Sequence, residues 1–158
     1  MSEPSCKKYA VIGLGNVLRS DDGIGIKLLE ALRQKWQNSD IAFQDFGIAS
    51  FDLAHHIEKY DAVLLIDAID AELEPGELKI FQLSDVHLGF NEKKLSSHEL
   101  ALSDLLRLCE TLGVKAEICI AGIQVKNVDY GLQMTSELEA VQARLVDEIS
   151  CFIESWFK

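Results

Sequence analysis

The chain has 158 residues, of which 48% are apolar and 26% are charged, so it has enough apolar material for one compact core. Its 15 Lys and Arg side chains against 26 Asp and Glu give a net charge of −11, which excludes a general nucleic-acid binder and disfavours an anionic membrane as partner. No apolar run approaches the roughly 20 residues that cross a bilayer, and residues 1–8 lack the apolar stretch of a signal peptide. We therefore expect a single domain over residues 1–158, located in the cytoplasm and monomeric.

The cysteines are widely spaced and form no C-x-x-C pair. They are Cys6, Cys109, Cys119 and Cys151. This spacing is typical of a reduced cytosolic protein with small buried thiols and argues against a disulfide framework or a zinc–thiolate site.

Short apolar runs alternate with helical periodicity along the chain. Strands are predicted at 8–14, 41–46, 62–66, 77–83 and 117–123, and helices at 24–36, 51–59, 100–108 and 138–156. The fourth strand alternates polar and apolar residues, as an edge strand does, and residues 84–97 read as a long loop. The pattern predicts an α/β fold in three layers, α/β/α, with a mostly parallel twisted sheet of about five strands, one of them antiparallel.

The first turn after a strand, residues 13–25, reads G-L-G-N-V-L-R-S-D-D-G-I-G. Leu18 stands where a dinucleotide fingerprint needs its third glycine. The acidic pair Asp21 and Asp22 would repel a phosphate at the start of the next helix. A nucleotide-binding regulator is therefore a weak alternative, based only on the strand–turn–helix opening.

The start of that helix has further unusual features. Ser20 is a plausible N-cap, and the acidic pair behind it could simply complement the helix dipole. Gly23 and Gly25 each cost a helix roughly 1 kcal/mol relative to alanine. We therefore expect something to approach the backbone closely here.

Two other candidate residues lie just after a predicted strand or at the start of a predicted helix, where parallel α/β sheets place functional side chains. Asp67 directly follows the run 62–66, where a partly desolvated carboxylate needs a hydrogen-bond donor, a cation or a proton; capping the next turn is the alternative. His98 follows Ser96 in a capping box with Glu99, and a helix N-terminus favours the neutral imidazole that ligates metals. A structural or surface role for His98 is the alternative.

Asp22, Asp67 and His98 are all expected at the carboxyl edge of the sheet. Two carboxylates and one imidazole form a mixed site for a divalent transition metal, with positions open for water or substrate. Ni, Zn, Mn and Fe(II) all suit this ligand set, and the chemistry of the ligands does not choose among them.

These segments resemble those of the hydrogenase maturation endopeptidases, which remove a C-terminal extension from the large subunit of [NiFe] hydrogenase. The resemblance spans nearly the whole chain. It is carried by residues 13–25, Asp45-x-Gly47, Ile66-Asp67-Ala68, Ser97-His98-x-Leu100 and Gly122-Ile123-Gln124, which follow in the order of the family.

The resemblance implies that Asp22, Asp67 and His98 bind nickel supplied by the hydrogenase large-subunit precursor, although another divalent metal stays possible. It also suggests that Asn16, Asp45 and Gly47 contact the substrate or support the metal ligands. No residue is assigned as the catalytic general base.

The chain departs from the family pattern at two positions. Phe46 replaces a glycine and is expected to narrow or reshape a substrate groove, and Val125 replaces a proline, which changes loop stiffness more than chemistry. The loop 84–97 is the expected contact for the precursor.

One further interpretation stays open. A metal-responsive binding or chaperone protein for hydrogenase assembly could use the same site without cleaving anything. A serine or cysteine protease is not supported, because the sequence has no G-x-S-x-G elbow and no recognisable nucleophile motif.

Overall fold

The computed structural model describes residues 6–88 and 102–158. The strands of its single five-stranded sheet lie in the order β2-β1-β3-β5-β4. They are β1 (Tyr9–Leu14), β2 (Ala42–Gly47), β3 (Ala62–Ile69), β4 (Leu78–Gln82) and β5 (Glu117–Gln124).

Four of the strands run parallel and one runs the other way. β1 pairs in parallel with both β2 and β3, and β3 pairs in parallel with β5. β4 is antiparallel to β5 and forms one edge of the sheet. The predicted α/β class and the alternating edge strand are confirmed.

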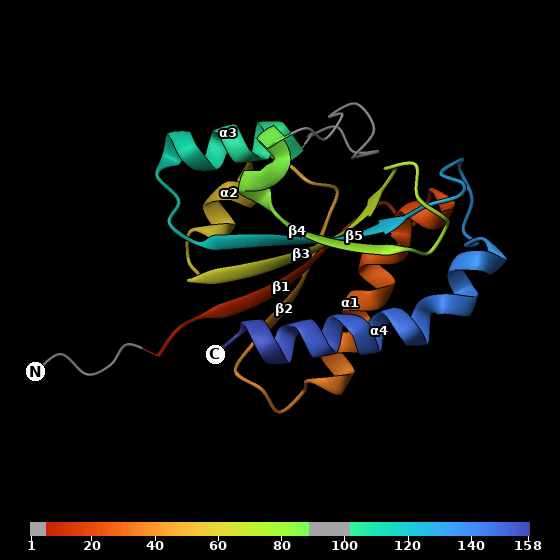
Figure 1. The fold of residues 1–158 in the computed structure, drawn as a ribbon, viewed down its shortest axis with the longest axis horizontal. Helices are drawn as coiled ribbons and strands as arrows, with labels where there is room; N and C mark the ends of the chain where they lie inside the picture. The colour runs from red at the N-terminus through yellow and green to blue at the C-terminus, as the bar shows by residue number, and fades with distance from the viewer. Residues whose placement is uncertain (1–5, 89–101) are drawn as a thin grey trace, which may run out of the picture.

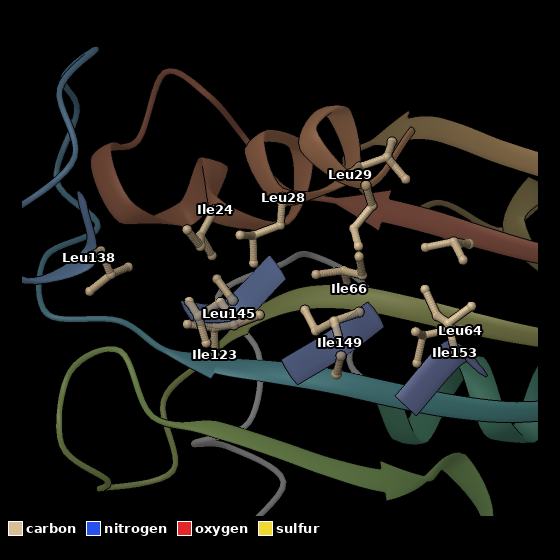
Figure 2. Close-up of a cluster of buried hydrophobic side chains, with 14 of the residues drawn as sticks. Ile24, Leu28, Leu29, Leu64, Ile66, Ile123, Leu138, Leu145, Ile149 and Ile153 are labelled. Carbon is tan, nitrogen blue, oxygen red and sulfur yellow. The ribbon is translucent and has the colours of Figure 1, made fainter. Parts of the chain in front are cut away.

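Helices cover both faces of the sheet (Figure 1). α1 (Ile24–Lys35) and α4 (Ser136–Trp156) lie on one face, and α2 (Asp52–Ile57) and α3 (Leu102–Leu112) lie on the other. Figure 2 shows the core under α1 and α4, where Leu28 and Ile149 belong to one buried cluster with Ile66 of the central strand β3. Apolar burial on both faces explains why the central strands are continuous apolar runs.

The structure extends two of the predicted strands. β3 continues past residue 66 to Ile69 because β5 continues beside it, and Asp67 pairs with Gly122 in that extension. Asp67 therefore lies inside a strand rather than directly after one.

The predicted loop 84–97 begins with a 3₁₀ helix, η2 (Leu83–Leu88), and the rest of it lies outside the described residues. Within 6–88 and 102–158, no helix combines the length and apolar composition that a membrane span requires.

The expectation of buried thiols is right for half of the cysteines. Cys109 and Cys119 are buried, whereas Cys6 and Cys151 are exposed. Burial, reinforced by neighbouring carboxylates, raises the pKa of Cys109 and of Cys119 to about 11. All are free thiols.

Candidate active site

The strand order reverses at the carboxyl ends of β1 and β3. From β1 the chain passes to β2 on one side of the sheet, and the later strands β3, β5 and β4 are added on the other side. In open parallel sheets, ligands bind in the crevice outside the strand ends at such a reversal. Asp22 follows β1 and Asp67 lies near the end of β3, so both carboxylates belong to this point of the fold.

Gly25 allows the start of α1 to pack against both strand ends. A β-carbon at this position would lie 2.3 Å from the carbonyl oxygen of Leu14 and 2.5 Å from that of Ile66. The close approach expected from the glycine pattern is therefore made by the backbone of the chain itself. As a result, the 3₁₀ turn η1 (Ser20–Gly23) contacts β3.

Both candidate carboxylates are buried. Asp22 and Asp67 are each 1% exposed. The backbone amide of Asn16 donates to Oδ2 of Asp22 at 3.1 Å. Buried carboxylates at one sheet edge suit a divalent cation, because a cation compensates for their lost hydration.

The other acid of the pair, Asp21, has a different role from the one its position suggests. Its buried carboxylate accepts hydrogen bonds from the amides of Lys126, Asn127 and Thr135 at 3.0, 3.0 and 2.7 Å. The Thr135 hydroxyl donates to it as well. Asp21 therefore ties the turn after β1 to the loop after β5.

Ser20 does not cap the following helix. The N-cap of α1 is Gly23, since the turn η1 comes between Ser20 and the helix. The Ser20 hydroxyl instead donates to the carbonyl of Asp129 at 2.8 Å, and its backbone has a positive φ of 50°. Ser20 thus helps Asp21 to hold the same loop.

Three residues suggested as substrate contacts or ligand supports shape the neighbouring turns. The Asn16 side chain accepts from the Leu18 amide at 3.0 Å, and the Asp45 side chain accepts from the Gly47 amide at 2.9 Å. The Gly47 carbonyl accepts from the Gly15 amide at 2.8 Å, which joins the turns after β1 and β2. Gly47 has a φ of +64°, which disfavours any other residue.

Gln124, the last residue of the Gly122-Ile123-Gln124 motif, organises the turn after β3. Its buried side chain accepts from the Ala71 and Leu73 amides and donates to Asp70 and to the Val125 carbonyl. Its hydrogen-bonding capacity is fully used inside the protein.

Phe46 packs against the core under α2 and α3, with its ring centroid 5.6 Å from that of His56. Its expected effect on a substrate groove stays a prediction.

The third predicted ligand, His98, lies outside the described residues. In the part of the chain that is described, no three His, Cys, Asp or Glu side chains gather as a metal site. The structure therefore places Asp22 and Asp67 at one sheet edge and leaves the full Asp22–Asp67–His98 set as a prediction.

Comparison with known proteins gives a consistent result. Residues 26–151 match the model of a family described as hydrogenase maturation protease. Hydrogenase expression/formation protein HupD of Rhizobium leguminosarum is 26% identical, with 99% of this chain and 79% of that protein covered.

Solved structures agree with this match. The [NiFe] hydrogenase maturation protease HybD of Thermococcus kodakarensis is 28% identical with a TM-score of 0.73, covering 92% of this chain and 98% of that one. The hydrogenase maturating endopeptidase HybD of E. coli has a TM-score of 0.79 at 24% identity, covering 94% and 93%, and so supports the fold.

Proposed function

The chain belongs to the hydrogenase maturation protease family and is therefore a peptidase, and from this membership we propose that it removes the C-terminal extension of a [NiFe] hydrogenase large-subunit precursor. The observation that carries the proposal is the burial of Asp22 and Asp67 at the strand-order reversal. Peptide hydrolysis needs a site that stabilises developing charge, and buried carboxylates with a bound cation supply one.

Nickel enters this site as part of the substrate. Asp22, Asp67 and His98 recognise the nickel already inserted into the precursor, so that only a metal-loaded precursor is cut. Oxygen and imidazole donors suit nickel and other divalent transition metals, and the burial of both described carboxylates supports a cationic partner. Zinc, manganese or iron would fit the same donors and is the competing identity for the metal.

The protein works in the cytoplasm as a monomer, with the precursor as its partner. The net charge of −11 supports the monomer, because like-charged copies repel one another.

A processing assay tests the proposal. Purified protein is mixed with nickel-loaded or nickel-free large-subunit precursor, and the product mass is recorded. A shortened product only with nickel is the expected result. Cleavage of both forms would remove the role of nickel, and a stable complex without any shortened product would instead identify a non-cleaving metal-responsive chaperone.

A further inference from the structure

Large apolar side chains are exposed around the candidate active site. They lie in the loops that follow β1, β2 and β5, at the edge of the sheet that contains Asp22 and Asp67. We call them the apolar rim: Val17, Leu18, Ile48, Phe51, Tyr130 and Leu132. Phe51, Tyr130 and Leu132 are 72%, 87% and 76% exposed. Among residues 6–85 and 104–158, whose side-chain exposure is described, one further large apolar side chain is exposed, Leu112 at the end of α3.

The loops of the rim are fixed to one another by hydrogen bonds. The Gly131 amide donates to the Leu18 carbonyl at 2.8 Å, and the Ser20 amide donates to the Gly131 carbonyl at 2.9 Å. Figure 1 shows the segment after β1 beside the segment that follows β5. Together with the buried Asp21 carboxylate, these bonds make a rigid platform out of loops that would otherwise be mobile.

The most exposed aromatic ring of the rim is also oriented by a contact. The Arg19 guanidinium lies 5.7 Å from the centroid of the Tyr130 ring, and its Nε donates to the Val128 carbonyl at 3.1 Å. An aromatic side chain held in place loses little conformational entropy on binding. Tyr residues are common among the residues that dominate the energy of protein interfaces.

The rim adjoins the candidate active site directly. A β-carbon on Gly23 would lie 3.0 Å from the α-carbon of Val17, so Val17 packs on the residue next to Asp22. Exposed apolar side chains gathered in adjoining loops mark a candidate site of contact with another molecule. A partner that reaches Asp22 and Asp67 would therefore also meet the rim.

We propose that the apolar rim is the docking surface for an apolar segment of the hydrogenase precursor next to the bond that is cut. The proposal rests on the proposed function, because the rim lies in loops next to the carboxylates assigned to cleavage. The bound segment is expected to be apolar because the rim consists of aromatic and aliphatic side chains. It is expected to be a polypeptide because the substrate of a peptidase is a polypeptide.

Substitutions in the rim test the proposal through KM. Tyr130→Ala and Leu132→Glu are expected to raise the KM for nickel-loaded precursor about tenfold or more, as the loss of an interface hot spot does. The kcat at saturating precursor is expected to stay near that of the wild type. The control is Leu112→Glu, which makes the same change at a leucine outside the rim that is 37% exposed. It should leave both KM and kcat unchanged.

Direct binding of the precursor separates this proposal from the proposed function. A wild type that binds precursor through the rim without cleaving it would contradict the peptidase function and keep the docking surface. Wild-type KM and binding in both rim variants would overturn the docking surface. Analytical ultracentrifugation compares the oligomeric state of the wild type with that of Leu132→Glu. A wild-type dimer that is lost in Leu132→Glu, with KM unchanged, would show that the rim binds a second copy of the chain and would overturn the proposal.

Discussion

A β-carbon on Gly25 would lie 2.5 Å from the carbonyl oxygen of Ile66, the residue that precedes Asp67. The start of α1 and the end of β3 therefore touch through their backbones. This contact brings η1, with Asp22, against β3 and so fixes where the two buried carboxylates lie relative to the sheet.

Gly25→Ala is expected to lower the free energy of unfolding by about 2 kcal/mol or more, since the added methyl group meets backbone oxygens that cannot rotate away. Urea denaturation measures the loss. Gly131→Ala is the matched control, because its β-carbon would meet only the Ser20 hydroxyl, at 3.2 Å. Equal stability of the two variants would contradict the close backbone contact.

Asp21→Ala is expected to lower the free energy of unfolding by about 3 kcal/mol, because it leaves the amides of Lys126, Asn127 and Thr135 without their acceptor. Hydrogen exchange of these amides should accelerate in the folded protein. Asp129→Ala removes an exposed carboxylate of the same loop and should change neither quantity. Unchanged exchange in Asp21→Ala would show that the loop is held by something else.

The half-buried position of His56 predicts a pH dependence of stability. Burial, with a smaller contribution from Lys59, lowers the pKa of His56 below its usual 6.5. The unfolded chain then binds this proton more readily than the folded one, so stability is complete above pH 6.5 and falls as the pH drops through the folded pKa. The urea midpoints of wild type and His56→Gln, compared between pH 7.5 and 5.5, measure this. The wild type should lose more stability on acidification, and parallel pH profiles would contradict the assignment.

The thiols should react in two classes. Cys6 and Cys151 are exposed and should react rapidly with a thiol reagent at pH 8. Cys109 and Cys119 should react only on unfolding, because they are buried and have a pKa of about 11, so the thiolate is scarce. Peptide mapping after timed labelling identifies the sites, and early labelling of Cys119 would contradict the burial.

Most of the fold could be predicted from the sequence. Short apolar runs and the 3.6-residue periodicity of helices are local properties of the sequence. They were sufficient to predict all five strands, including the antiparallel edge strand. The end of β3 was misjudged because its last residues, up to Ile69, are held by pairing with β5, as in the pair Ile69 and Gln124. That pairing is not visible in either segment alone.

The candidate site was predictable only in part. Asp22 and Asp67 could be found because each follows a predicted apolar strand, where a parallel sheet places its functional side chains. The hydrogen bonds that the Asp21 carboxylate accepts could not be predicted, because its partners Lys126 and Thr135 lie more than 100 residues away in the sequence. The apolar rim was missed for a similar reason: Leu18 and Tyr130 are unremarkable singly and become a surface only when the loops meet.

The most direct test of the account compares Asp22→Asn and Asp67→Asn in the precursor-processing assay. Asn keeps the shape of each buried side chain while removing its charge, so folded variants are expected, as circular dichroism and thermal denaturation would verify. Asp70→Asn, at an exposed position three residues beyond Asp67, is the control. The account predicts that both buried variants fail to shorten nickel-loaded precursor while the control processes it normally. Full processing by folded Asp22→Asn or Asp67→Asn would contradict the assignment of these carboxylates to the active site.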